Sequence, residues 1–229
     1  MRSPMETLIF DCDGVLVDSE VIAEATLVEQ LRDWLPDLQA DTVLHHALGM
    51  TTENILLHLE ALSSHALPAD ALPRIDHAIE ARLARELQPI DGVVDTLSRL
   101  PLPLAIASNS SRFRVRNSLA TTGLDAWLGE VPLFTAEQVA LPKPDPGVYL
   151  LATRELGCSP QDCLVVEDSV SGVTAARAAG MTVIGFTGAS HIPPDHAEHL
   201  KEAGAWRILR HMTGLEALVS EWRQRRHPA

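Results

Sequence analysis

Short apolar runs alternate with longer segments of helical spacing along this chain of 229 residues. The first run, residues 7–10, is typical of a strand buried on both faces, and Gly14 marks a sharp turn after it. From residue 20 to residue 35, apolar side chains recur every three or four positions, which predicts an amphipathic helix. Pro36 ends this helix because proline cannot continue the backbone hydrogen bonds.

The segment after the first strand contains helical patterns and no convincing strand. Further helices are expected over residues 41–48, 51–62 and 68–87, with Gly49 and Pro68 as breaks. We therefore predict an all-helical domain over residues 17–89, inserted into a core domain formed by residues 1–16 and 90–229.

From residue 90 onwards, strand and helix patterns take turns. The expected strands are 102–107, 130–134, 163–166, 181–186 and 206–209, and the expected helices are 93–100, 111–122, 145–156 and 170–179. Such alternation with short loops predicts an α/β fold, a Rossmann-like parallel sheet with helices on both faces. The basic stretch 222–226 is interpreted as a fraying, solvated helix end.

Polar residues gather where the predicted strands end. They are Asp11 and Asp13, then Ser108, Asn109 and Ser110, then Lys143 in a proline-flanked loop, then Glu167 and Asp168. In an open parallel sheet the carboxyl ends of the strands meet at one edge, where ligands bind. We therefore expect these four clusters to converge, although they are far apart in the sequence.

The residue types in these clusters indicate phosphoryl chemistry. Carboxylates crowded at one edge need a cation, and hard oxygen ligands favour Mg²⁺. Lys143 adds a second positive charge, while Ser108, Asn109 and backbone amides offer hydrogen-bond donors to an anion. A magnesium ion, a lysine and such donors around a carboxylate form a phosphoryl-transfer site.

Four motifs carry a resemblance to a known family. They are Asp-Cys-Asp-Gly-Val from residue 11, Ser-Asn-Ser from residue 108, Lys-Pro-Asp-Pro from residue 143 and Glu-Asp-Ser-x-Ser-Gly from residue 167. In this order they resemble the motifs of the haloacid dehalogenase superfamily, over almost the whole chain. The helical insertion resembles the cap of the branch that contains β-phosphoglucomutase and small sugar-phosphate phosphatases.

The resemblance implies a role for each motif residue. Asp11 is the nucleophile that forms an aspartyl-phosphate, and Asp13 is the general acid and then the general base. Lys143 bridges the phosphoryl group and Asp11. The phosphoryl oxygens are held by Ser108 and Asn109. Mg²⁺ is bound by Asp11, by the main-chain carbonyl of Asp13 and by Asp168, and Glu167 is a further ligand or holds a water.

Each residue also has a simpler interpretation. Asp11 and Asp13 could be turn-forming residues or belong to a calcium loop, but an EF-hand would need a glutamate where Ile22 stands. The serines and Asn109 of the second motif could be a helix cap, Lys143 a surface lysine, and Asp168 with Ser169 an N-cap. The enzyme interpretation would be replaced only if all of these simpler interpretations held at once. We therefore favour the enzyme interpretation. Four further residues, His45, His46, Thr51 and Thr52, fall in the insertion; the histidines are interpreted as cap surface and the threonines as possible substrate contacts.

Proteins with these motifs catalyse several different reactions, and individual residues of this chain help to distinguish among those reactions. Dehalogenation needs neither Asp13 nor a metal ligand such as Asp168. Phosphonate hydrolysis needs a cap lysine, and no lysine precedes Lys143. Related mutases carry an arginine shortly after the cap-loop glycine, and Gly49 is followed by none. We therefore expect a phosphatase of small metabolites, sugar or sugar-acid phosphates, with a β-phosphoglucomutase-like mutase and a non-catalytic phosphometabolite-binding protein as alternatives.

Composition limits the partners and the compartment. A formal net charge of −13, with lysines only at positions 143 and 201, argues against nucleic acid or an anionic membrane as a partner. Three scattered cysteines make no disulfide framework or zinc site, and Cys12 is expected to pack in the core. The start has no signal-peptide pattern and no 18-residue apolar run occurs. A cytoplasmic monomer or weak homodimer is expected.

Overall fold

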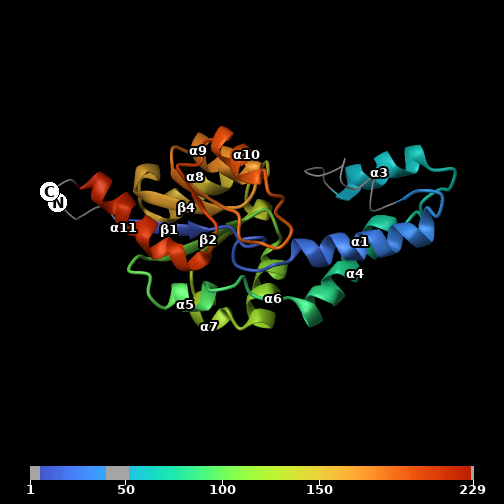
Figure 1. The fold of residues 1–229 in the computed structure, drawn as a ribbon, viewed down its shortest axis with the longest axis horizontal. Coiled ribbons are helices and arrows are strands. Elements are labelled where there is room, and N and C mark those ends of the chain that lie inside the picture. Colours follow the sequence, from blue (N-terminus) through green and yellow to red (C-terminus); the bar gives the residue numbers. More distant parts are fainter. Residues whose placement is uncertain (1–5, 40–51, 228–229) are drawn as a thin grey trace. The chain divides into compact units, whose positions relative to one another are not determined.

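A computed structural model describes residues 6–39 and 52–227, and these form two compact units (Figure 1). Unit 1 comprises residues 1–19 and 87–229, and unit 2 comprises residues 20–86. The helix expected over residues 41–48 lies outside the described residues, as do His45, His46, Gly49 and Thr51.

Unit 1 is built on a single sheet in which all neighbouring strands are parallel. The strands are β1 (Thr7–Phe10), β2 (Leu104–Ser108), β3 (Leu133–Thr135), β4 (Cys163–Glu167), β5 (Thr182–Phe186) and β6 (Arg207–Leu209). Their order is β3-β2-β1-β4-β5-β6, so the chain fills one side of β1 and then the other. The predicted Rossmann-like α/β core is confirmed, with a topological switch point between β1 and β4.

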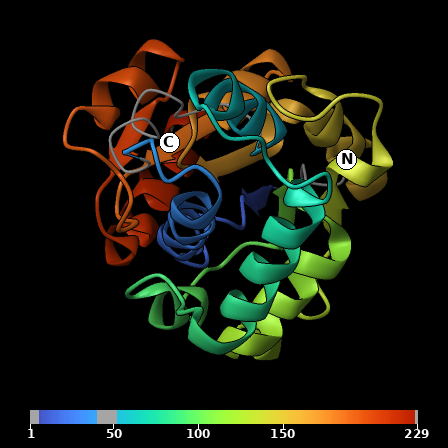
Figure 2. The same ribbon diagram turned by 90° about the vertical axis from the view of Figure 1, so that its right-hand side faces the viewer.

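Helices cover both faces of the sheet (Figures 1 and 2). One face carries α8 (Gly147–Leu156), α9 (Val170–Ala178) and α10 (His196–Glu202), and the other carries α5 (Val93–Leu97), α6 (Arg112–Thr122), α7 (Asp125–Leu128) and α11 (Leu215–Arg226). Short 3-10 turns occupy Ala136–Gln138, Pro160–Asp162 and Met212–Gly214. Because both faces are covered, the central strands are continuous apolar runs with polar residues only at their ends, rather than alternating.

The core beneath α8 and α9 fixes the pleat of the central strands. Ile9, Val165 and Ala107 point to this face and pack with side chains of the helices, among them Tyr149. Each large apolar side chain fully buried in this way contributes about 1.5–3 kcal/mol. Side chains continue to alternate between the two faces of the sheet beyond the end of β1. The strand that supplies core residues therefore also sets the direction of the side chains that follow it.

The C-terminal segment differs from its prediction. Residues 222–226 end a docked helix, α11, in which Trp222 is 3% exposed. Arg223 pairs with Glu6 at 2.8 Å, and Arg226 pairs with both Glu6 and Asp162. Residues 223–225 are exposed, which agrees with the predicted solvated helix end. The prediction that this end frays is wrong, because buried apolar surface and ion pairs with Glu6 and Asp162 hold the helix.

The described part of unit 2 contains helices and no strand. These are α1 (Glu20–Trp34), α3 (Thr52–Leu62) and α4 (Ala71–Glu86), and α1 packs along α4 (Figure 1). The buried side chains of α4, Ala71, Ile75, Ile79 and Leu83, recur at helical spacing, as the sequence predicts. Across residues 6–39 and 52–227, no helix has the length and apolarity needed to cross a bilayer. That unit 2 acts as a cap, with the predicted boundaries at residues 17 and 89, stays a prediction.

Candidate active site

The first strand delivers two aspartates to the carboxyl edge of the sheet. Asp11 directly follows β1, and its backbone N–H donates to the Val166 carbonyl at 3.0 Å, which continues the pairing of β1 with β4. Gly14 then turns the chain with a φ of 72°, a region that favours glycine. A Cβ at Gly14 would lie 1.9 Å from Asp168 Oδ2, so the close approach of these two segments also requires glycine.

The Lys143 ammonium lies at the centre of the site. It donates to Asp11 Oδ1 at 2.6 Å, to Glu167 Oε1 at 2.6 Å and to the Ala107 carbonyl at 2.8 Å. Its side chain is 3% exposed. Three donor hydrogens therefore meet three acceptors at the ends of β1, β2 and β4. The predicted clusters that contain Asp11, Lys143 and Glu167 thus meet at one edge of the sheet, as expected.

Asn109 holds the backbone on which Lys143 sits. Its Oδ1 accepts from the Lys143 N–H at 2.9 Å, and its Nδ2 donates to the Lys143 carbonyl at 3.2 Å. Ser108 beside it is buried, and its Oγ accepts from the Ser110 N–H at 3.0 Å. Contacts of Ser108 and Asn109 with phosphoryl oxygens stay a prediction; bracing of Lys143 by Asn109 is a role that the sequence did not reveal.

Glu167 is fully buried and its two carboxylate oxygens have separate partners. Besides Lys143, Oε1 accepts from the Tyr149 hydroxyl at 2.7 Å, and Oε2 accepts from the Ser169 hydroxyl at 3.1 Å. Sequence reasoning missed Tyr149. The available signal was that it is the one tyrosine of the chain, in the first turn of the helix that follows Lys143, and a buried tyrosine hydroxyl needs a partner.

Asp13 is held by two hydroxyl groups. Ser19 donates to Oδ1 at 2.7 Å and Ser110 donates to Oδ2 at 2.6 Å. A hydroxyl group can donate or accept, so this pair can accompany Asp13 whether its carboxyl group is ionised or protonated. Asp13 is therefore held at both of its carboxyl oxygens.

Asp168 is contacted by two histidines that the sequence did not single out. His196 Nε2 lies 2.6 Å from the Asp168 carbonyl oxygen, and His191 Nε2 lies 3.4 Å from Asp168 Oδ2. Both histidines come from the segment between β5 and the start of α10. The sequence did not indicate either histidine, because neither stands in a recognisable motif at the end of a strand. Only the tertiary fold brings them to Asp168.

Burial and crowding set the electrostatics of the site. Burial raises the pKa of Asp11 well above its usual value; Lys143 opposes this rise, and the other carboxylates add to it. Burial lowers the pKa of Lys143, but Asp11, Glu167 and the Tyr149 ring hydroxyl outweigh it and raise that pKa well above its ordinary value. The site thus holds one buried ammonium group and a larger number of carboxyl groups.

The donor set fits a hard divalent cation. One oxygen each from Asp11, Glu167 and Asp168 can be chosen so that all three lie within 4.8 Å of one another. Carboxylate oxygens are the ligands that Mg²⁺ takes, often only one or two of them with waters completing the shell. Because Lys143 compensates only part of this charge, a divalent ion would relieve the remaining repulsion.

The simpler interpretations fare differently in the structure. The N-cap of α6 is Ser111, which accepts from the Arg114 N–H, so residues 108–110 are not that helix's cap. Ser169 does cap α9, accepting from the Gly172 N–H at 3.0 Å, and its hydroxyl also contacts Glu167 Oε2. Glu167 Oε1 contacts Lys143 and Tyr149, and Asp168 Oδ2 lies beside His191. The reading of Lys143 as a surface lysine is wrong, since it is buried.

Glycine at position 172 leaves the space that Glu167 occupies. A Cβ there would lie 1.9 Å from Glu167 Cδ. An alanine normally stabilises a helix interior relative to glycine. In this helix we expect Gly172→Ala to lower the free energy of unfolding by about 1–3 kcal/mol through overpacking. Urea unfolding measures it, with exposed Thr174→Ala on the same helix as the control; a stabilised Gly172→Ala variant would contradict the packing described here.

The three cysteines are free thiols that differ in access. Cys12 and Cys163 are buried, and burial raises the pKa of both thiols, whereas Cys158 is half-buried. The thiolate is the reactive form. We therefore expect a disulfide reagent to modify one thiol rapidly in the native protein, with the rapid phase lost in Cys158→Ser. A rapid phase that persists in that variant would contradict these environments.

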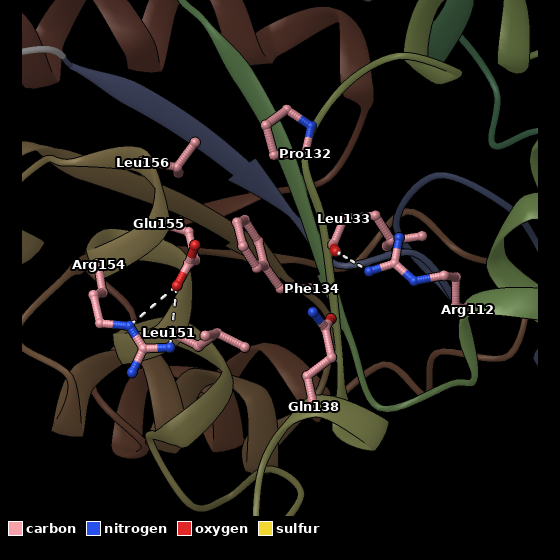
Figure 3. A pocket seen from close by; sticks show the side chains of 9 residues that line it. All are labelled: Arg112, Pro132, Leu133, Phe134, Gln138, Leu151, Arg154, Glu155 and Leu156. Carbon is pink, nitrogen blue, oxygen red and sulfur yellow. Dashed lines mark hydrogen bonds and ion pairs between the residues drawn. The ribbon is translucent and has the colours of Figure 1, made fainter.

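A separate pocket lies at the β3 edge of the sheet, and it is distinct from the candidate active site around Lys143. This pocket of ≈ 540 Å³ is lined by nine residues of β3, α6, α8 and neighbouring turns, drawn in Figure 3. Arg112 donates across it to the Leu133 carbonyl at 2.9 Å, which blunts the exposed edge of β3. Arg154 pairs with Glu155. No predicted site residue lines this pocket.

Comparisons with known proteins agree with the motifs. The family model of the haloacid dehalogenase-like hydrolases matches residues 8–186. The chain is 35% identical over 188 residues to hexitol phosphatase A of Escherichia coli, covering 81% of this chain and 84% of that protein. It is 28% identical over 196 residues to 6-phosphogluconate phosphatase of the same organism, covering 84% and 87%.

A solved structure is similar over nearly the full length. It is a conserved haloacid dehalogenase-like protein of unknown function from Agrobacterium tumefaciens, with a TM-score of 0.86 and 40% identity, covering 96% of this chain and 99% of that one. The chain therefore belongs to the haloacid dehalogenase-like hydrolase family.

Proposed function

We propose that this protein is a Mg²⁺-dependent phosphatase of small phosphorylated metabolites, sugar or sugar-acid phosphates, acting through an aspartyl-phosphate on Asp11. The observation that carries the proposal is the buried Lys143 ammonium, 2.6 Å from Asp11 Oδ1, with Asp13 two residues further along the chain. The relatives named hexitol phosphatase and 6-phosphogluconate phosphatase support the substrate class.

In the first step the Asp11 carboxylate attacks phosphorus and the bond from phosphorus to the alcohol oxygen breaks. Asp13 gives its proton to that oxygen as it leaves. Lys143 offsets the negative charge around the transferring group, and it does so without reorganisation because three acceptors already fix it.

In the second step a water takes the place of the alcohol. Asp13, now ionised, accepts a proton from this water, whose oxygen attacks phosphorus and releases phosphate and free Asp11. The hydroxyls of Ser19 and Ser110 stay with Asp13 through both steps, donating or accepting as its protonation changes.

Asp11, Asp168 and the Asp13 carbonyl would hold the magnesium ion, with Glu167 as a further ligand or holding a water. When bound, the ion would supply positive charge to the phosphoryl oxygens and separate the carboxylates. Unit 2 is proposed to act as the cap that excludes water from the leaving-group side and selects the substrate.

Phosphate release from a panel of phosphorylated metabolites tests the proposal. The panel contains 6-phosphogluconate, hexitol phosphates and p-nitrophenyl phosphate, each assayed with Mg²⁺ and with EDTA. We expect release that requires Mg²⁺. Absence of release from every compound would favour the binding-protein alternative. With β-glucose 1-phosphate, glucose 6-phosphate accumulating faster than free phosphate would instead assign the mutase.

A further inference from the structure

The loop between β5 and α10 reaches the carboxylate cluster. His191 in this loop places Nε2 3.4 Å from Asp168 Oδ2, and its side chain is 20% exposed. A Cβ on Gly14 would lie 3.1 Å from His191 Cε1, so the ring packs against the turn that follows Asp13 as well. The histidine is thus positioned by two sides of the site.

The same loop is fastened one residue earlier. The Ser190 N–H donates to Asp18 Oδ1 at 3.2 Å, and the Ser190 hydroxyl donates to Asp18 Oδ2. Asp18 in turn donates its backbone N–H to the Gln88 carbonyl at 3.0 Å. Residues 18 and 88 lie in unit 1, next to the two points where the chain passes into unit 2. The Ser190–Asp18 hydrogen bonds therefore hold the His191 loop to these connecting segments.

Asp168 is also fixed from its backbone. His196 Nε2 lies 2.6 Å from the Asp168 carbonyl oxygen, which can only accept, so this nitrogen carries a hydrogen. His196 thus contacts the backbone of Asp168, and His191 lies beside one of its two carboxylate oxygens.

We propose that His191 is a positioning residue for the divalent-ion site: it donates from Nε2 to Asp168 Oδ2 and turns the carboxylate toward the ion, and the Asp18–Ser190 contact keeps His191 in place. This inference rests on the proposed function, because it assigns Asp168 to the metal. A histidine N–H that donates to a metal-binding carboxylate fixes the direction of the carboxylate oxygens. Partners of this kind typically change metal affinity 10–100-fold.

Direct binding of Mn²⁺, followed by electron paramagnetic resonance of the free ion, tests this without any turnover. We expect His191→Leu to raise the dissociation constant about 10–100-fold. His191→Gln, which keeps a donor, is expected to recover part of the affinity. Asp18→Asn and Ser190→Ala are expected to weaken binding less than His191→Leu, and to add nothing in a double variant with it, since they act through the same side chain.

His211→Leu is the matched control, because His211 is an exposed histidine of the same unit. It is expected to bind Mn²⁺ as the wild type does, and all variants are compared by thermal unfolding in EDTA. Wild-type affinity in His191→Leu would overturn the inference, as would a changed KM for substrate with an unchanged dissociation constant for Mn²⁺. A wild type that binds Mn²⁺ but releases no phosphate would overturn the proposed function alone.

Discussion

Replacing Asp11 with asparagine is expected to lower the rate of phosphate release by roughly 10⁴–10⁶-fold. A loss of this size is typical when one member of a set of catalytic residues that act together is removed. The amide keeps the shape of the carboxylate but is a poor nucleophile toward phosphorus. The substitution also removes one of the two carboxylates that contact Lys143. Phosphate release under saturating substrate and Mg²⁺ measures the effect.

Asp91→Asn is the matched control, because Asp91 is exposed in the same unit. It is expected to retain wild-type activity. The folding of Asp11→Asn is checked by thermal unfolding, since a buried carboxylate of raised pKa is not a stabilising feature in itself. Wild-type turnover by a folded Asp11→Asn variant would exclude Asp11 as the nucleophile.

Replacing Lys143 with methionine is expected to remove activity and to lower the free energy of unfolding by about 3–5 kcal/mol, the usual result of breaking a buried ion pair. Methionine fills a similar volume but leaves Asp11 and Glu167 buried without their shared ammonium. The Ala107 carbonyl loses its side-chain donor as well. Urea unfolding near neutral pH measures the loss.

Two further variants separate this cause from a general packing effect. Adding Glu167→Gln to Lys143→Met removes one of the stranded charges, so the double variant is expected to be more stable than Lys143→Met alone. Lys201→Met removes an exposed lysine paired with Glu198 and is expected to change stability by no more than about 0.5 kcal/mol. A Lys143→Met variant as stable as the wild type would contradict the buried network.

The sequence predicted the sheet because its strands are apolar on both faces. β4 and β5 read as continuous apolar runs, and their predicted bounds differ from the structure by one residue at one end. The helix α10 escaped detection because it is short and only Ala197 and Leu200 of it are buried. The docking of α11 was missed because Glu6, its partner, lies more than 200 positions away in the chain.

The site residues at strand ends were predictable for a related reason. Parallel strands bring their carboxyl ends together, so Asp11, Lys143 and Glu167 could be expected to meet without knowledge of the loops. The only signals for Tyr149 were that it is the one tyrosine of the chain and that it follows Lys143 closely. His191 could not be expected there, because the direction of a loop is set by packing. The residues that meet at the strand ends could thus be predicted, whereas most of the residues that hold them in place could not.

The most direct test of the account is to trap the covalent intermediate. Enzyme mixed with excess substrate and Mg²⁺ is quenched in acid within the first turnover, digested and examined by mass spectrometry. We expect one phosphoryl group on the peptide that contains Asp11, absent from the EDTA control and from Asp11→Asn. Phosphate release by the wild type with no such adduct on Asp11, or with an adduct on another residue, would contradict it.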